Sequence, residues 1–187
     1  KETLDTYLPK RVPEWKVKKA REAYKENLPL LTEISKKYRV QARFIVALWA
    51  LETNFGKYQG KMPILSSIAT LSYDGRREAF FKKQLFASLE ILQQGHISKD
   101  RFVGSWAGAM GQCQFIPTSF LAYAQDGDGD GKKDIWGNRA DVFASIANYL
   151  KREGWSDQKT WGRQVKLPGN FDKSHIMPKG SKGRKQW

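Results

Sequence analysis

An apolar run at positions 43–56, RFIVALWALETNFG, constrains the fold more than any other feature of this chain. Its apolar residues recur with helical spacing, which predicts a helix packed against a hydrophobic core. On a wheel of about 100° per residue, Glu52 falls between Leu48 and Ile45 on the apolar side. Burial there disfavours the charged carboxylate, so Glu52 is expected to stay protonated towards neutral pH and to act as a proton donor. The alternative, that Glu52 turns out to water near the helix end before Gly56, stays open.

The composition fits a folded protein with an excess of positive charge. The 187 residues suit one domain, or one large lobe with an appendage. Lys and Arg number 33 against 19 Asp and Glu, so the net charge of +14 predicts attraction to polyanions. Nucleic acid, an anionic cell-wall polymer and a membrane surface all qualify. No basic run interleaved with aromatic residues and no zinc-finger pattern supports nucleic acid, which we do not expect as a partner.

The cysteine content and the chain ends say little about the compartment. Cys113 is the only cysteine, so no intrachain disulfide can form, and we expect it to be a small buried residue. The chain opens without an initiator methionine or an apolar signal region, and no stretch approaches the roughly 18 apolar residues of a membrane span. We therefore expect a soluble, monomeric chain that has been processed or trimmed.

Capping residues and apolar spacing predict a mainly α-helical fold. Residues 1–12 are interpreted as extended, and residues 155–187, rich in Lys, Gly and Pro, as a basic appendage of loops with a short strand at 164–167. The core is accordingly expected to span residues 1–154. Besides the run at 43–56, helices are predicted at 14–25, 27–38, 63–72, 74–94, 117–124 and 138–153.

The segment 104–117, GSWAGAMGQCQFIP, differs from the helices around it. Its glycines and alanines allow close backbone approach, while Ser105, Gln112 and Gln114 offer hydrogen bonds of the kind that a carbohydrate cleft needs. A tightly packed helical hairpin is the structural alternative. Function is favoured because buried amides and hydroxyls would otherwise need internal partners.

An acidic loop at 126–137, DGDGDGKKDIWG, matches the first half of an EF-hand calcium loop. Acidic residues occupy loop positions 1, 3 and 5, and a glycine occupies position 6. Position 12 is Gly137, however, so the usual bidentate glutamate is missing, and water or Asp141 is needed to complete the shell. An Asp/Gly turn without metal is the alternative, but crowded carboxylates repel one another unless a cation joins them. The expected calcium ligands are the side chains of Asp126, Asp128, Asp130 and Asp134 and the carbonyl of Lys132.

Several of these motifs occur in an order that resembles the lytic murein transglycosylases of the B type. The matching segments are ETNFG at 52–56, ATLSY at 69–73, SWAGAMGQCQFIP at 105–117, the acidic loop, and ASIANYL at 144–150. The resemblance implies a lysozyme-like helical core that cleaves bacterial peptidoglycan in the periplasm, with lipoprotein attachment to the membrane in some members. Such proteins usually continue past a segment like 155–187, which implies that this chain is a truncated or cleaved form.

The resemblance also implies roles for the matching residues. Glu52 matches the single catalytic acid/base, and the acidic loop matches the calcium site. The residues matching the sugar-binding cleft are Ser105, Gln114 and Phe115, with Gln112 added from its place in the segment; a cleft aromatic is matched by Tyr7 and a basic pair on the peptide side by Arg76 and Arg77.

One acid without a second carboxylate suggests a reaction that the substrate assists. Glu52 would protonate the glycosidic oxygen, and the muramyl 6-hydroxyl would then attack to leave a 1,6-anhydro end. The alternatives are a lysozyme-type hydrolase, a non-catalytic peptidoglycan-binding scaffold if further C-terminal sequence is needed for activity, and a nucleic-acid binder that rests on charge alone.

Overall fold

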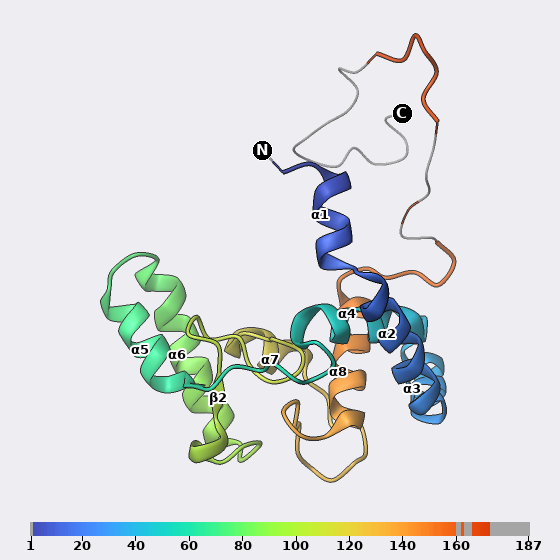
Figure 1. Ribbon diagram of the computed structural model, residues 1–187. Helices are drawn as coiled ribbons and strands as arrows, with labels where there is room; N and C mark the ends of the chain where they lie inside the picture. The colour runs from blue at the N-terminus through green and yellow to red at the C-terminus, as the bar shows by residue number, and fades with distance from the viewer. Residues whose placement is uncertain (1, 160–161, 163–165, 173–187) are drawn as a thin grey trace. The chain divides into compact units, whose positions relative to one another are not determined.

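Helices form most of the described chain, which comprises residues 2–159, 162 and 166–172 of a computed structural model (Figure 1). The mainly α-helical prediction is thus confirmed. The described helices are α1 (Leu4–Arg11), α2 (Glu14–Glu26), α3 (Leu28–Tyr38), α4 (Ala42–Thr53), α5 (Ile64–Tyr73), α6 (Glu78–Gln93), α7 (Pro117–Tyr123) and α8 (Arg139–Arg152), with a 3₁₀ turn, η1, at Lys99–Arg101.

Two helices, α4 and α8, carry the centre of the hydrophobic core. Helix α8 buries residues all round its first half, including Phe143 and Ile146, and packs against α3, α4 and α7. Helix α4 buries Ile45, Val46 and Trp49 on one face and also packs against α2 and α3. A helix buried on this scale derives its stability from packing more than from propensity. Side chains on α4 and α8 are therefore carried by helices that the core holds in place.

A second group of helices lies beside this core. Helices α5 and α6 form a close pair, and α6 also packs against α7 (Figure 1). The buried Gln84 of α6 accepts hydrogen bonds from the backbone N and the Oγ1 of Thr118, at 3.0 and 3.1 Å, in the first turn of α7. These bonds satisfy donors that the start of a helix leaves free. The α6 side chain thus fixes where α7 begins.

A small antiparallel sheet pairs the segment before α5 with the segment after η1. Strand β1 (Met62–Pro63) pairs with β2 (Val103–Gly104), with Met62 opposite Gly104 and Pro63 opposite Val103. The backbones lie so close that a Cβ on Gly60 would come within 2.1 Å of the Gly104 carbonyl oxygen. Only glycine, at a φ of +87°, fits there.

The N-terminal segment is helical, so the interpretation of residues 1–12 as extended is wrong. Helix α1 begins with a capping box between Thr3 and Thr6, and it has Asp5 in its first turn and Lys10 in its last. These charges favour a helix through its dipole. A second difference concerns Asp74, where α6 was predicted to begin. Asp74 instead ends α5, and a turn with positive φ at Gly75 and Arg77 delays α6 to Glu78.

The chain divides after Asp157, and the first unit contains the whole helical core. The short strand predicted at 164–167 lies partly outside the described residues, and Lys166 and Leu167 belong to no strand. No helix among the described residues is long and apolar enough to cross a membrane.

Candidate active site

Glu52 lies in the last turn of α4, between two anchored residues. Trp49 and Thr53 are buried, whereas Glu52 itself is exposed to solvent. The helix ends at Asn54, which adopts a left-handed conformation with a φ of 50°. Glu52 makes no hydrogen bond or ion pair with any residue in the described part of the chain. Its carboxyl group is therefore free to meet a ligand.

A pocket of about 200 Å³ opens beside this carboxyl group. Its walls come from α4, the loop before α7, α7 itself and α8. The structure thus brings together three of the residues that the sequence predicted, Glu52, Gln114 and Phe115. Glu52 is the only carboxylate among the described residues that line it. The lining residues are Leu48, Glu52, Cys113, Gln114, Phe115, Ile116, Ser119, Ile146 and Tyr149.

The environment of Glu52 makes it a better proton donor than a free glutamate. Its side chain is not buried on the apolar face of α4, as the helical wheel suggested, but it is enclosed on one side by the pocket wall. This partial removal from water raises the pKa of Glu52 above its usual value. Burial also raises the pKa of the Cys113 thiol, so that this neighbour stays protonated and unreactive.

The loop between Ser105 and Pro117 places Gln114 and Phe115 in the pocket. It is held by isolated bridges between Gly104 and Met110 and between Met110 and Phe115, so the alternative of a helical hairpin is wrong. Gln114 has a φ of 51°, and its Nε2 donates to the Gly111 carbonyl at 2.9 Å. The Phe115 ring packs against Tyr149, with centroids 5.8 Å apart and ring planes inclined by 54°. The amide and the ring are thus fixed before any ligand arrives.

Two other residues of this loop, Ser105 and Gln112, form hydrogen bonds within the protein and do not line the pocket. The hydroxyl of Ser105 accepts a hydrogen bond from the backbone N of Ala109 at 2.9 Å, which closes a turn of the loop. The Gln112 amide lies between Trp49 and Trp136, with bonds to both. Neither residue is among those that line the pocket beside Glu52.

The three remaining predicted residues also lie outside the pocket lining. Tyr7 is on α1, where the Arg11 guanidinium stacks over its ring at 5.2 Å. Arg76 is paired with Asp74 at 3.0 Å in the turn between α5 and α6. Arg77 lies over the Phe80 ring at 4.1 Å. The structure therefore does not bring these three side chains to Glu52.

Sequence reasoning missed Ser119 and Tyr149 as pocket residues. Tyr149 shares a face of the helix predicted at 138–153 with Ile146, three residues earlier. That spacing was the available signal for a wall formed by α8. Ser119 comes from the first turn of α7, and its place next to Glu52 depends on contacts between distant segments that no local pattern encodes.

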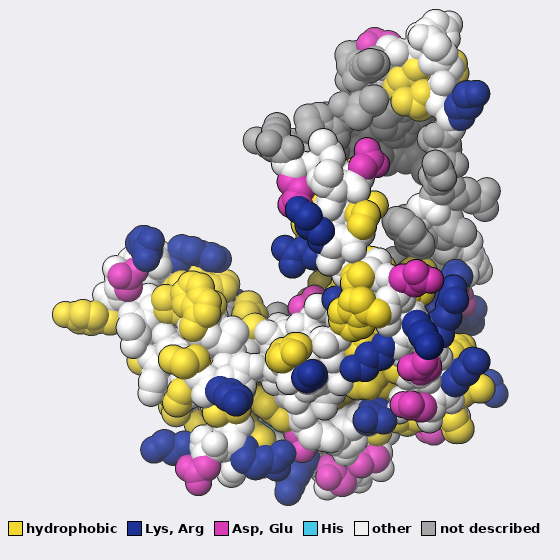
Figure 2. Space-filling view, viewed as in Figure 1, with side chains coloured by type: hydrophobic (Ala, Val, Ile, Leu, Met, Phe, Trp, Pro, Cys, Tyr) yellow, Lys and Arg dark blue, Asp and Glu magenta, His cyan; other side chains and the backbone are white. Residues whose placement is uncertain are grey.

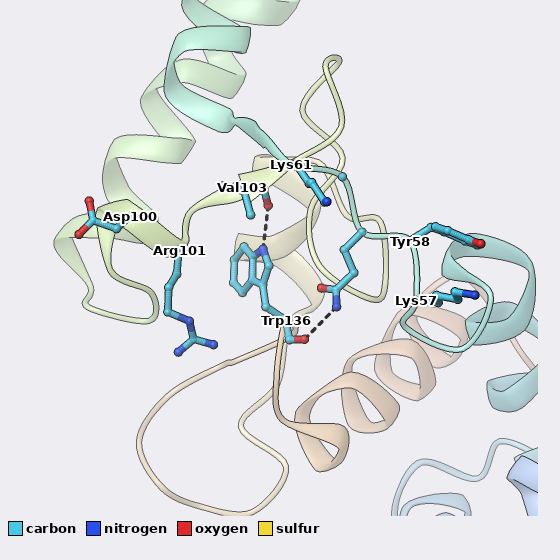
Figure 3. A pocket seen from close by; sticks show the side chains of 9 residues that line it. Lys57, Tyr58, Lys61, Asp100, Arg101, Val103 and Trp136 are labelled. Carbon is cyan, nitrogen blue, oxygen red and sulfur yellow. Dashed lines mark hydrogen bonds between the residues drawn. The ribbon is translucent and has the colours of Figure 1, made fainter.

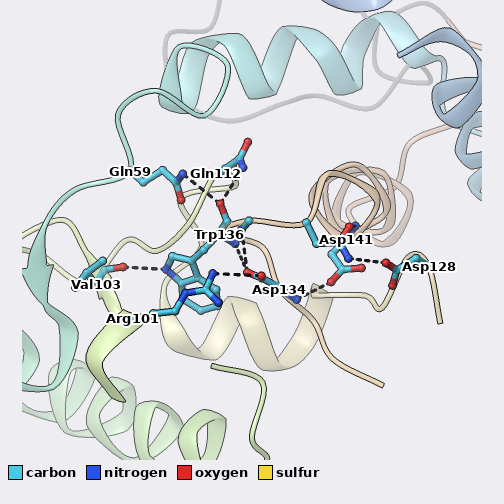
Figure 4. A network of polar contacts seen from close by, with 10 residues as sticks. Gln59, Arg101, Val103, Gln112, Asp128, Asp134, Trp136 and Asp141 are labelled. Carbon is cyan, nitrogen blue, oxygen red and sulfur yellow. Dashed lines mark hydrogen bonds and ion pairs between the residues drawn. The ribbon is translucent and has the colours of Figure 1, made fainter. Parts of the chain in front are cut away.

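The acidic loop gathers three carboxylates around a small space. Oxygens of Asp126, Asp128 and Asp141 lie within 4.8 Å of one another among the described residues. Asp141 is fully buried at the start of α8, and burial raises its pKa to about 6. Asp134 touches the cluster through its backbone N, which donates to the Asp141 carboxylate at 2.6 Å, whereas its own carboxylate accepts from the backbone N of Trp136 and pairs with Arg101 at 3.5 Å (Figure 4). Asp130 accepts from the backbone N of Lys132.

A larger recess, of about 690 Å³, is lined in part by the loop after α4 (Figure 3). Lys57, Tyr58 and Lys61 line it from that loop, and the other walls include Asp100, Arg101, Val103 and Trp136. The Trp136 indole N donates to the Val103 carbonyl at 2.9 Å, so the ring is held as part of the wall. The recess as a whole carries a net positive charge, which fits an anionic group better than a cation.

A mainly helical core around a pocket with one free carboxylate defines a lysozyme-like protein of the lytic transglycosylase type. The chain belongs to the transglycosylase SLT domain family, whose family model matches residues 1–187. The resemblance inferred from the motifs is therefore confirmed. Membrane-bound lytic murein transglycosylase B of Escherichia coli (strain K12) is 39% identical over 119 residues, which is 63% of this chain and 33% of that protein.

Solved structures support the same assignment. SltB3 of Pseudomonas aeruginosa, in complex with NAG-NAM-pentapeptide, superposes with a TM-score of 0.89 at 44% identity, over 93% of this chain and 46% of that one. The Escherichia coli lytic transglycosylase Slt35, in complex with calcium, gives a TM-score of 0.77 at 32% identity, over 82% of this chain and 49% of that one. The chain thus spans half or less of the length of these relatives.

Proposed function

We propose that this chain carries the catalytic core of a peptidoglycan lytic transglycosylase. The observation that carries the proposal is the free carboxyl group of Glu52, alone among amide, hydroxyl and aromatic groups in a pocket. Family membership supports it. So do the structures of SltB3, which was solved with NAG-NAM-pentapeptide and with NAG-anhNAM-pentapeptide. The bond cleaved would be the β-1,4 link between N-acetylmuramic acid and N-acetylglucosamine.

A single carboxyl group is sufficient if the substrate supplies the second catalytic group. Glycosidases that use water need two carboxylates about 5–9 Å apart, one of which activates water or attacks the sugar. No second carboxylate lines the pocket among the described residues. We infer that the acetamido carbonyl of the muramyl residue stabilises its anomeric carbon while the bond breaks.

Glu52 then acts twice in one turnover. In the first step its proton passes to the glycosidic oxygen, the bond from that oxygen to the anomeric carbon breaks, and the N-acetylglucosamine part leaves as an alcohol. In the second step the Glu52 carboxylate takes the proton of the muramyl 6-hydroxyl, whose oxygen bonds to the anomeric carbon. The product ends in 1,6-anhydro-muramic acid, no water is consumed, and Glu52 regains its proton.

The remaining pocket residues would bind the sugars. Gln114 and Ser119 offer hydrogen bonds, and Phe115 and Tyr149 offer ring faces for stacking. Tyr7, Arg76 and Arg77 keep their expected roles as more distant substrate contacts, with the Tyr7 ring meeting a sugar of a long strand and the two arginines facing its peptides. For Ser105 we propose support of the loop that presents Gln114, since its hydroxyl is bonded within that loop.

Substitution Glu52→Gln tests the function. We expect the variant to bind peptidoglycan like the wild type and to lose more than about 99% of turnover, because Gln cannot supply the proton. Glu33→Gln, at an exposed position on α3, serves as the control and should keep full activity. Mass spectrometry of the product ends decides the reaction class. Ends heavier by one water would instead identify a lysozyme-type hydrolase, and near wild-type turnover of Glu52→Gln would refute the role of Glu52.

A scaffold without activity is the second candidate, because the chain spans only 33% of the Escherichia coli relative and 46% of SltB3. It predicts binding to peptidoglycan without release of products. The location that fits either function is the periplasm or the cell wall, where peptidoglycan lies. Attachment as a lipoprotein remains a prediction, supported by the name of the membrane-bound relative from Escherichia coli.

We also infer that the acidic loop binds calcium. Asp141 would supply the carboxylate that Gly137 lacks at loop position 12, since its oxygens lie with those of Asp126 and Asp128. The residues fit a hard cation, because they offer oxygen ligands only and because a buried carboxylate beside two others is costly without a counter-charge. Calcium bound there would neutralise this charge. Asp130, Asp134 and the Lys132 carbonyl stay proposed ligands.

Calcium removal should lower stability without changing the fold. We expect calcium in excess of its dissociation constant to raise the melting temperature, since a ligand that binds only the folded state stabilises it by about 2.7 kcal/mol at a hundredfold excess. Asp128→Asn should abolish this dependence, whereas the exposed Asp100→Asn, outside the loop, should retain it. A melting temperature that ignores both calcium and chelator would contradict the site.

A further inference from the structure

The backbone and side chain of Gln112 are bonded within the protein on both sides. Its backbone N donates to the Ile135 carbonyl at 2.8 Å, and its Nε2 donates to the Trp136 carbonyl at 2.9 Å. On the other side, its Oε1 accepts from the Trp49 indole N at 2.7 Å, and its backbone carbonyl accepts from the Thr53 hydroxyl at 3.2 Å. An amide engaged in this way has little left to offer a sugar.

These bonds join two parts of the molecule that are distant in sequence. Ile135 and Trp136 lie at the end of the acidic loop, whereas Trp49 and Thr53 lie in the last turns of α4. The Gln59 side chain donates to the same Trp136 carbonyl at 3.2 Å, but its other hydrogen bond goes to the Gly56 carbonyl and not to α4 (Figure 4). The Gln59 backbone carbonyl accepts from Gln114 Nε2 at 3.3 Å, a bond that does not involve its side chain. Gln112 is thus the side chain of this pair that reaches the helix itself.

Packing leaves the Gln112 amide no room to turn away. A Cβ on Gly56 would come within 2.3 Å of the Gln112 Oε1, so the chain after α4 lies directly on the amide. The Trp49 ring is held by edge contacts to Phe55 and Phe143, at centroid distances of 5.5 and 5.1 Å. The amide therefore forms a rigid link between Trp136 of the acidic loop and Trp49 of α4, which we call the strut.

The two anchored residues of α4 flank Glu52. Thr53 follows it directly, and Trp49 precedes it by three residues, nearly one helical turn. The Thr53 hydroxyl also accepts from the backbone N of Gly56 at 3.0 Å, which fixes the turn that ends the helix. Loss of the strut would let this last turn move, and Glu52 would move with it.

We propose that Gln112 is a positioning residue, which holds the last turn of α4 so that the Glu52 carboxyl group faces the pocket at a fixed depth. The inference rests on the proposed catalytic role of Glu52. It replaces the sugar contact that the sequence suggested for Gln112. Precision matters here because a misplacement of roughly 1 Å can reduce a rate by about a hundredfold.

The substitution Gln112→Met tests the proposal, because methionine has the shape of glutamine without its hydrogen bonds. With soluble peptidoglycan fragments as substrate, we expect kcat to fall about tenfold or more while KM stays within about twofold. A sugar contact would show the reverse pattern, with KM raised. Gln59→Met is the matched control: it removes a bond to the same Trp136 carbonyl but leaves Trp49 bonded, so kcat should be retained.

An NMR titration of the Glu52 carboxyl group gives a readout that does not need activity. If the strut fails in Gln112→Met, the last turn of α4 should become more solvated, and the pKa of Glu52 should fall towards its usual value; Gln59→Met should leave it unchanged. The other titratable groups that line this pocket are Cys113 and Tyr149, and both are kept in the two variants. An unchanged pKa in Gln112→Met would overturn the proposal.

Trp49→Phe provides a second route if Gln112→Met does not fold. It removes the indole N–H and keeps an aromatic ring in the core, and it should lower kcat and the pKa of Glu52 in the same direction. In the double variant the two losses should not add fully, because both substitutions remove the same hydrogen bond between Trp49 and Gln112. Additive losses, or wild-type kcat in both single variants, would refute the strut. Failure of the wild type itself to release anhydro products would refute the proposed function, while the titration still decides the role of Gln112.

Discussion

At the scale of single residues, the raised pKa that makes Glu52 a good proton donor also lowers the stability of the folded protein at neutral pH. Its pKa is raised because the pocket wall removes part of its hydration. A carboxyl group with a folded-state pKa above its unfolded-state value binds protons more tightly in the folded protein. The stability of the fold therefore falls as the pH rises through that interval, and it stays lower at neutral pH.

Glu52→Gln should consequently be more stable than the wild type at pH 7. We expect a gain below about 1 kcal/mol, because the side chain is exposed enough for water to screen the charge. At pH 3 both side chains are neutral, so the difference should vanish. Urea denaturation at both pH values measures the effect, with Glu33→Gln as an exposed control that should show none. A gain that persists unchanged at pH 3 would attribute it to packing instead of charge.

Residue roles were predictable where a motif fixes the chemistry and not where partners are distant. Glu52 stands out as a carboxylate in an apolar run, and Gln114 and Phe115 lie with it in the pocket. Gln112 is also a glutamine and lies two positions before Gln114, but its side chain is hydrogen-bonded to Trp49 and Trp136. The sequence shows that an amide is present but not which groups bond to it, because those groups lie on segments that are distant in the sequence.

At the scale of elements, the start of α8 joins the hydrophobic core to the acidic loop. The Asn138 side-chain oxygen accepts from the backbone N of Ala140 at 2.9 Å and of Asp141 at 3.4 Å, and its Nδ2 donates to Asp128 at 2.7 Å. One side chain thus caps the helix and orients a proposed calcium ligand.

Asn138→Ala should lower the free energy of unfolding by about 1–2 kcal/mol, since it removes a helix cap. Asn138→Ser should recover most of this loss, because a serine hydroxyl can accept from the same backbone donors. Denaturant unfolding in the presence of chelator measures the cap alone. Equal stability of the alanine and serine variants would contradict a capping role.

Elements were predictable where caps and apolar spacing agree, as they do for α8. Helix α1 was missed because it buries no residue, so it has no apolar stripe to detect, and its signal lies only in the pair Thr3 and Thr6. The start of α6 was misplaced because Arg77 takes a positive φ, which sequence favours for glycine. The loop at 105–117 shows no period at all, and its shape follows from bridges to its own backbone.

At the scale of the whole molecule, the net charge of +14 is not concentrated at the pocket. Figure 2 shows Lys and Arg side chains spread over the face in view instead of gathered in one patch. The pocket beside Glu52 is lined by no Lys or Arg among the described residues. We therefore attribute the proposed sugar recognition to this pocket, which holds no basic side chain, and long-range attraction of anions to the surface.

This division predicts how binding responds to salt. Exposed charges act over a Debye length of about 10 Å at 0.1 M salt and about 3 Å at 1 M, so binding to anionic peptidoglycan should weaken steeply between these concentrations. Glu52→Gln is suited to the measurement because it should bind without cleaving. A neutral N-acetylglucosamine oligomer carries no charge for the basic surface to attract, so its affinity should change little. Affinity for peptidoglycan that does not depend on salt would show that the surface charge serves another partner, whereas equal salt dependence for both ligands would place the charge in the pocket itself.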